Sequence, residues 1–281
     1  MWTTFSTRYR HMRAKIFLPS DLFDLRLFDT LDVSKLMARA ERLEWDTPSL
    51  YRLVLRHLGA EGEDVRAWLV SFGVVFHDTG DDGWMPDEPP EDVTRRWLSA
   101  TLRVIVAAHG TRSYVDKWIS NRLRDGRDRV APRSMLGFFR ESARLALARP
   151  PRSHWNHLLA VDDAVEAIGT VGAQRVDEIR AVYPWVDRLE HLRGRVVPLP
   201  RPEVEAILSA DAPSAPRPTV PREGQAVTTE LVRLGMLREV GGRDRLDVPD
   251  LFVRHWGVLR HAASAGGPSM APSPTVPARG T

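Results

Sequence analysis

The stretch that decides the fold of the C-terminal end reads "QAVTTELVRLGMLREVGGRDRLDVPDLF" and spans residues 225–252. Apolar residues recur at helical spacing in its first half, up to Leu237. Two short runs then flank Gly241 and Gly242, which is the pattern of two strands joined by a tight glycine-rich turn. A last helix-like segment starts at Asp250. The stretch therefore predicts a helix, a hairpin and a second helix.

A helix followed by a tight hairpin is typical of the end of a winged helix, and we expect such a module over residues 225–261. On its N-terminal side, residues 211–224 read "DAPSAPRPTVPREG", a composition rich in Pro, Ala and Ser that predicts a linker. On its C-terminal side, the low-complexity residues 262–281 predict a disordered tail.

Residues 59–210 carry mainly helical periodicity and predict a helical domain. The clearest helix in this part begins at Pro132, because proline is favoured at the first helical position, and runs to about Ala148. The acidic segment 77–92 is rich in Gly and Pro and predicts a loop. The fold class is therefore predicted as mainly α with small β elements.

Residues 1–58 predict two strands followed by a helix. The apolar run from Lys15 to Leu18 is ended by a proline, and polar and apolar residues alternate at about 42–45, so each segment predicts a strand. Asp46 is a natural N-cap for the helix that follows, and we expect Gly59 to end that helix.

The sequence lacks the residues of several common sites. It has no cysteine, which excludes disulfides, thiolate zinc sites and cysteine nucleophiles. No GxxxxGK[ST] phosphate-binding loop, GxSxG motif or HExxH motif occurs, and the nine histidines show no metal-ligand spacing. We therefore predict no catalytic residue and no metal site. No apolar run approaches the roughly 18 residues of a membrane helix, so we expect a cytoplasmic chain without membrane contact.

The densest basic cluster is "RLRDGRDRVAPR", residues 122–133. Arginine binds phosphate through two parallel hydrogen bonds, and the predicted helix start beside it adds backbone N–H donors. Arg127, Arg129 and Arg133 are therefore candidates for contact with phosphate or nucleic acid. Asp125 and Asp128 interrupt the cluster, so the alternative is a solvated turn whose arginines are ion-paired.

The predicted hairpin is a second candidate for nucleic-acid contact through Arg243 and Arg245. In winged-helix proteins that bind DNA, a helix of the module enters the major groove. The helix predicted before this hairpin carries Arg233 as its one base, beside Glu230. DNA binding is therefore the alternative interpretation, since modules of this kind also contact proteins.

Three stretches, in this order, resemble the C-terminal half of bacterial P-loop ATPases of the AAA/STAND type. They are "RAKIFLPSDLFD" with "RLEWDTPSLYRLVLRHLG", then "WISNRLRDGRDRVAPRSMLGFFRESA", then "TTELVRLGMLREVGGRDRLDVPDLF", and they cover about half of the chain. The resemblance implies that residues 1–58 hold the last strands of an ATPase core and the first helix of its lid. It implies a helical lid over residues 59–210 and a winged helix after it. The Walker A and Walker B parts of such an ATPase are missing.

The same resemblance assigns Arg133 to a Pro-Arg pair that opens a lid helix, where the arginine senses the nucleotide phosphates. A phosphate site needs the backbone and lysine of the absent P-loop. We therefore expect no cofactor on the chain alone, and ATP with Mg²⁺ only where a partner supplies the P-loop. The predicted function is a non-catalytic regulatory or interaction protein that works with a protein partner or an ATPase core. The alternative is a nucleic-acid-binding winged-helix protein.

Overall fold

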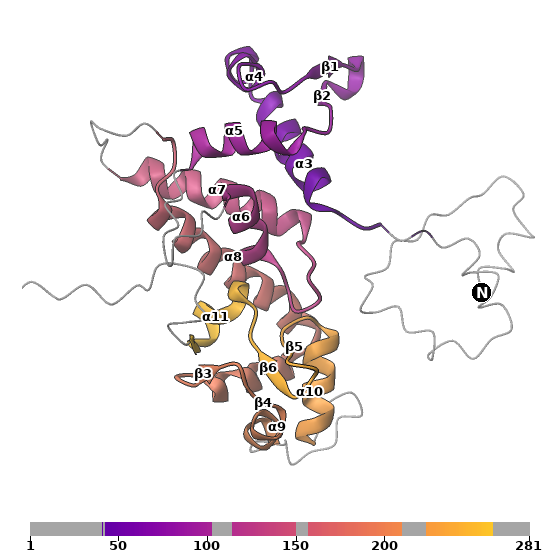
Figure 1. Ribbon diagram of the computed structural model, residues 1–281, viewed down its shortest axis with the longest axis vertical. Helices are drawn as coiled ribbons and strands as arrows, with labels where there is room; N and C mark the ends of the chain where they lie inside the picture. Colours follow the sequence, from indigo (N-terminus) through magenta and orange to yellow (C-terminus); the bar gives the residue numbers. More distant parts are fainter. Residues whose placement is uncertain (1–40, 42, 103–113, 150–156, 210–222, 261–281) are drawn as a thin grey trace, which may run out of the picture. The chain divides into compact units, whose positions relative to one another are not determined.

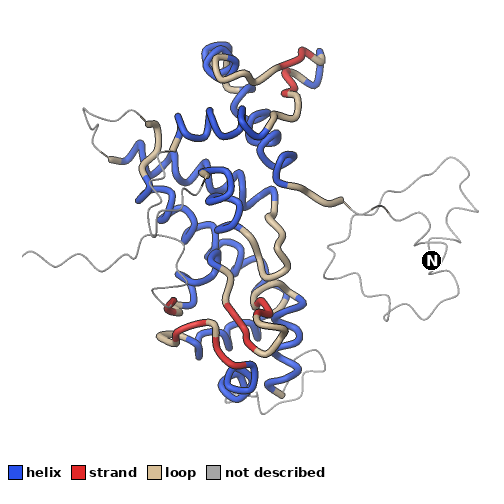
Figure 2. Tube along the Cα trace, viewed as in Figure 1, coloured by secondary structure: helices blue, strands red, loops and turns tan. Residues whose placement is uncertain are grey.

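The computed structural model describes residues 41, 43–102, 114–149, 157–209 and 223–260. The chain divides into two compact units, Met1–Leu43 and Glu44–Thr281, and nearly all described residues belong to the second. This second unit is mainly helical with small sheets, which confirms the coarse fold class predicted from the sequence (Figures 1 and 2). The predicted strand at 15–18, most of the predicted linker and the tail at 262–281 lie outside the described residues.

The first elements of the second unit are two helices, a hairpin and a third helix. The hairpin strands pair antiparallel, with His77 opposite Met85, and the turn between them contains two glycines with positive φ. The prediction of a loop over residues 77–92 is therefore wrong for the hairpin. Strands of three residues are too short to show an alternating pattern. The bounds are α3 (Thr47–Ala60), α4 (Glu63–Val70), β1 (Phe76–Asp78), the 3₁₀ helix η2 (Gly80–Asp82), β2 (Trp84–Pro86) and α5 (Glu91–Thr101).

The strand predicted at about 42–45 is wrong. Residues 43–46 form no strand, and Leu43 and Trp45 are 71% and 45% exposed. An alternating pattern becomes a strand only where a neighbouring strand and a core lie beside it. The segment instead leads into α3, whose predicted cap is confirmed because the Asp46 carboxylate accepts a hydrogen bond from the Ser49 N–H at 2.9 Å.

Gly59 does not end α3, which continues to Ala60. A Cβ at Gly59 would lie 2.5 Å from the ring of Phe76, so this glycine makes room for the start of the hairpin. The sequence suggested a helix stop, whereas the position serves the packing of β1 against α3.

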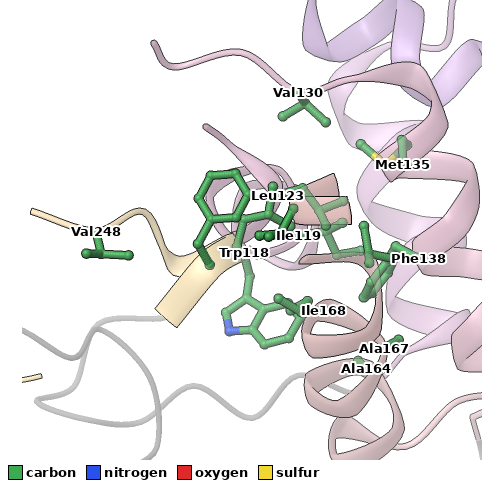
Figure 3. Close-up of a cluster of buried hydrophobic side chains, with 14 of the residues drawn as sticks. Trp118, Ile119, Leu123, Val130, Met135, Phe138, Ala164, Ala167, Ile168 and Val248 are labelled. Carbon is green, nitrogen blue, oxygen red and sulfur yellow. The ribbon is translucent and has the colours of Figure 1, made fainter. Parts of the chain in front are cut away.

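Three helices form the centre of the core: α6 (Val115–Leu123), α7 (Pro132–Ala148) and α8 (Val161–Val182). The predicted bounds of α7 are confirmed. Trp118 of α6, Phe138 of α7 and Ile168 of α8 converge in one buried cluster (Figure 3). Ala164 and Ala167 line the same side of α8, and their small side chains allow a bulky neighbour such as Phe138 to pack closely.

Residues 184–260 follow α8 and are called the C-terminal module here. Three of its strands form an antiparallel sheet in the order β4–β6–β5, and β3 pairs with β7 in parallel. The predicted helix, hairpin and final helix are confirmed as α10, β5–β6 and α11. The bounds are the 3₁₀ helix η3 (Pro184–Leu192), β3 (Val196–Val197), β4 (Leu199–Pro200), α9 (Arg201–Ser209), α10 (Gly224–Arg233), β5 (Arg238–Val240), β6 (Arg245–Asp247), α11 (Asp250–Trp256) and β7 (Leu259–Arg260).

Helices α9 and α10 pack against each other, although a segment predicted as a linker lies between them in the sequence. The Gly224 N–H donates to the Ser209 hydroxyl at 2.9 Å. A Cβ at Gly224 would lie 1.9 Å from the carbonyl oxygen of Glu205, so the start of α10 touches the backbone of α9.

The C-terminal module meets the central helices where α11 crosses α8. A Cβ at Gly172 would lie 1.9 Å from the carbonyl oxygen of Leu251, so the two helices are in backbone contact at this point. Both Leu251 and Trp256 of α11 are buried. The crossing therefore depends on a position in α8 without a side chain.

Replacing Gly172 by alanine is expected to lower the free energy of unfolding by about 2 kcal/mol or more, because the methyl group would have to displace the backbone of α11. Gly137→Ala in α7 is the matched control, since its added Cβ would meet Val171 at 3.4 Å. Alanine in a helix interior is favoured over glycine by about 1 kcal/mol, so the control should be neutral or stabilised. Urea unfolding followed by circular dichroism measures both variants, and equal stabilities would contradict the close crossing.

Candidate functional site at the arginine turn

Residues 124–131 connect α6 to α7 and are called the arginine turn here. Asp125 organises its backbone, because one carboxylate oxygen accepts hydrogen bonds from the N–H groups of Arg127 at 2.8 Å and Arg129 at 3.0 Å. The Asp125 N–H donates in turn to the Arg129 carbonyl at 2.9 Å. An aspartate that bonds the backbone two residues ahead is a common device of turns. The acidic residue in the basic cluster therefore has a structural role.

Each arginine around the turn has a carboxylate within ion-pair distance. The nitrogen–oxygen distances are 3.7–4.0 Å, longer than those of charge-assisted hydrogen bonds. The pairs are Arg122–Asp250, Arg124–Asp128, Arg127–Asp125 and Arg129–Glu44. This arrangement favours the solvated, ion-paired interpretation of the turn. A phosphate would have to compete with these carboxylates for the guanidinium groups.

Arg133 lies in the first turn of α7, and its partner differs from those of the turn. Its side chain is 81% exposed, and its guanidinium group hydrogen-bonds Glu178 of α8. Arg175 donates to the other oxygen of Glu178 at 2.8 Å. Burial raises the pKa of Glu178, but the hydrogen bonds from the two arginines outweigh that effect and hold the pKa below its ordinary value.

The structure places Arg243 and Arg245 on the β5–β6 hairpin rather than with the arginine turn. Arg243 is 83% exposed and lies 3.4 Å from Glu239. Its φ of 81° is in the left-handed region, and its carbonyl accepts a hydrogen bond from Arg201 at 3.1 Å. Arg245 donates to the Pro198 carbonyl. Both arginines are exposed, and both make hydrogen bonds or ion pairs within the module.

A buried ionic network in the C-terminal module was not anticipated from the sequence. Asp247 is 3% exposed and accepts from Arg238 at 2.7 Å and from Arg260. Arg260 also donates to Asp250 at 2.8 Å. Burial lowers the pKa of Arg260, but hydrogen bonds and attraction from these carboxylates outweigh it and raise the pKa. The one signal available was the hairpin register, which places Arg238 directly opposite Asp247.

Among the described residues, no three or more histidine, aspartate or glutamate side chains lie together as metal ligands would. Within the same residues, no helix combines the length and apolar character that crossing a membrane requires.

Comparisons with known proteins do not assign the chain to a family. No protein-family model matches it, and no curated protein or solved structure matches it significantly. The resemblance to AAA/STAND-type ATPases is therefore carried by the sequence motifs alone.

Arg133→Gln is expected to raise the pKa of Glu178, because it removes one of the two hydrogen bonds that stabilise the carboxylate. A carboxylate with a depressed pKa stabilises the fold above its unfolded pKa, and this contribution is lost as the pH falls through the folded value. The variant should therefore be less stable near pH 7 by well under 1 kcal/mol, since Arg133 is exposed, and equal to the parent at low pH.

A carbon-detected NMR titration of the side-chain carboxyls measures this shift. Arg144→Gln is the matched control, because that arginine of α7 pairs with Glu141 instead. An unchanged Glu178 titration in Arg133→Gln would show that the ion pair is not formed in solution.

Proposed function

We propose that this protein is a non-catalytic regulatory or interaction protein, similar in build to the helical lid and winged helix of AAA/STAND-type P-loop ATPases. It acts through contacts with a protein partner. The observation that carries the proposal is the order of elements: the packed helices α6, α7 and α8 are followed in the chain by the C-terminal module. The proposal extends the winged-helix assignment from residues 225–261 back to η3.

The order of elements supports a winged-helix assignment. A helix followed by a tight hairpin is the pattern of a winged-helix end, and a helix-turn-helix adds a second helix packed before it. The module contains η3, β3, β4, α9, α10, β5 and β6 in that order, with the packed pair α9 and α10 directly before the hairpin. In the three-stranded sheet, β4 pairs with β6 beside the hairpin strand β5, and β3 pairs outside this sheet with β7. In this assignment α10 takes the position of the recognition helix.

The surface of α10 favours a protein partner over DNA. Its exposed positions are Gln225, Ala226 and Thr229, and none of them carries a positive charge. Arg233 forms an ion pair with Glu230 at 2.7 Å, so its charge is balanced locally. Recognition helices of DNA-binding modules instead place basic side chains against the phosphates and base edges.

The contacts of the arginine turn favour a protein that binds no nucleotide by itself. Its arginines have acidic partners, and no GxxxxGK[ST] loop occurs in the 281 residues. Arg133 is exposed and keeps the candidate role of a phosphate sensor, with the P-loop supplied by a partner ATPase. In that role ATP and Mg²⁺ would bind only in the complex.

The second candidate function is nucleic-acid binding through the wing. The observation in its favour is the display of Arg243, which is 83% exposed at the hairpin. The two exposed arginines Arg243 and Arg245 supply at most two phosphate contacts, whereas specific DNA-binding proteins neutralise several phosphates. The two functions therefore differ in the expected strength and salt dependence of DNA binding.

Under the leading proposal, the purified chain should neither hydrolyse ATP nor bind duplex DNA at about 50 mM salt. Fluorescence anisotropy of a labelled duplex across a salt series and a phosphate-release assay measure these properties. ATP hydrolysis by the chain alone would overturn the proposal.

Measurable DNA binding would favour the second candidate if Arg243→Ala with Arg245→Ala reduced the slope of log K against log salt by about 2, as expected for two lost phosphate contacts. The matched control is Arg140→Ala with Arg144→Ala on α7, which should leave the slope unchanged. A direct test of the leading proposal is to search the genes flanking this one for a P-loop ATPase and to measure the ATPase rate of such a protein with and without the chain. That rate should change on adding the chain, and Arg133→Ala should reduce the effect.

A further inference from the structure

The arginine turn makes a backbone contact with the turn that joins α10 to β5. The Gly126 N–H donates to the Gly235 carbonyl at 2.6 Å. A Cβ at Gly126 would lie 2.1 Å from the carbonyl oxygen of Leu237, where no side chain fits. The φ angle of Gly126 is negative, so its backbone conformation is open to any residue. The need for glycine is therefore steric and comes from the C-terminal module.

The turn between α10 and β5 also requires a glycine at this contact. Gly235 has a φ of 75°, which favours glycine, and a Cβ there would also lie 2.9 Å from the Asp125 carboxylate. Its neighbours Leu234, Met236 and Leu237 are buried. Asp125 thus bonds the backbone of its own turn through one oxygen and faces Gly235 with the other.

A second attachment runs through the ionic network of the module. Arg122 of α6 lies 3.8 Å from Asp250, which also accepts from Arg260. Arg260 in turn bonds the buried Asp247 of β6. Because these contacts link α6 to α11, β7 and the hairpin, the module is held at two separate places on the α6–α7 side.

We propose that the arginine turn and the α10–β5 turn form a conformational joint, which fixes the orientation of the C-terminal module on the central helices. The main contact of the joint is the backbone-to-backbone approach of Gly126 and residues 235–237. The arginine side chains are secondary to it. Opening this joint would release the α10–β5 end of the module, while α11 stays packed on α8 at Gly172 and α6–α8 keep their packing. A signal passing between the central helices and the hairpin would use this release.

The regulatory meaning of the joint rests on the proposed function, but the joint itself does not. It predicts that a substitution at Gly126 changes the freedom of the module without changing the helical content. A substitution of an arginine in the same turn should change neither. Arg124 is the suitable control, because its side chain pairs with Asp128 of its own turn, at 4.0 Å, and with no described residue of the C-terminal module.

The chain has no cysteine, so two introduced cysteines can be labelled specifically. Ala143→Cys on α7 and Asp244→Cys on the hairpin place spin labels at exposed positions of the two parts. Pulsed electron–electron resonance on the full chain should give one narrow distance distribution in this background. Adding Gly126→Ala should roughly double the width or add a second distance, whereas adding Arg124→Ala should leave the distribution unchanged.

A single narrow distribution in Gly126→Ala, with circular dichroism unchanged, would overturn the joint. If Gly126→Ala does not fold, Asp125→Ala replaces it, because that variant loosens the turn without adding atoms to the contact. A narrow distribution in folded Asp125→Ala would overturn the joint equally, and a broadened one would support it. The distance measurement uses no partner, nucleotide or DNA. A result that overturns the joint would therefore not contradict the proposed function, and a result that overturns the proposed function would not contradict the joint.

Discussion

Backbone-to-backbone contact at glycine is the constraint on which the described part of the chain depends. Gly126 touches the carbonyl of Leu237, Gly172 touches that of Leu251, and Gly224 touches that of Glu205. The first two contacts attach the C-terminal module to the central helices, and the third closes α10 onto α9 inside the module. Steric contacts of this kind are short-ranged and tolerate no added atom, so they determine position more narrowly than the long ion pairs nearby. The orientation of the module is therefore set by the absence of side chains at a few positions.

Charge has two different roles in this structure, and burial separates them. The pairs around the arginine turn are long and partly exposed, and pairs of that kind contribute about 0–1 kcal/mol each. Asp247 is buried and accepts hydrogen bonds from both Arg238 and Arg260, and these two partners together offset the cost of burying its charge. The basic cluster that is prominent in the sequence therefore contributes little to stability, whereas the buried Asp247 of β6 bonds both β5 and β7.

Local patterns predicted the elements that depend on local physics. Pro132 marked the start of α7 and Asp46 the cap of α3, because both residues act on the backbone within one helical turn. The hairpin at 238–247 was visible because its glycines permit the turn. The strand predicted at 42–45 failed, since alternation alone supplies neither a paired neighbour nor a core. β4 was missed because two residues carry no periodicity, although this strand completes the sheet.

The sequence by itself determined where most helices lie, the chemistry that is missing, and the arginines that are candidates for contact with phosphate. Those properties follow from residue type and spacing within a few residues. Only the tertiary structure decided that Asp125 bonds the turn, that the turn's arginines face carboxylates such as Glu44, and that Gly126 meets the α10–β5 turn. These contacts join residues far apart in the chain, and a close approach between distant backbones leaves no local pattern except a glycine.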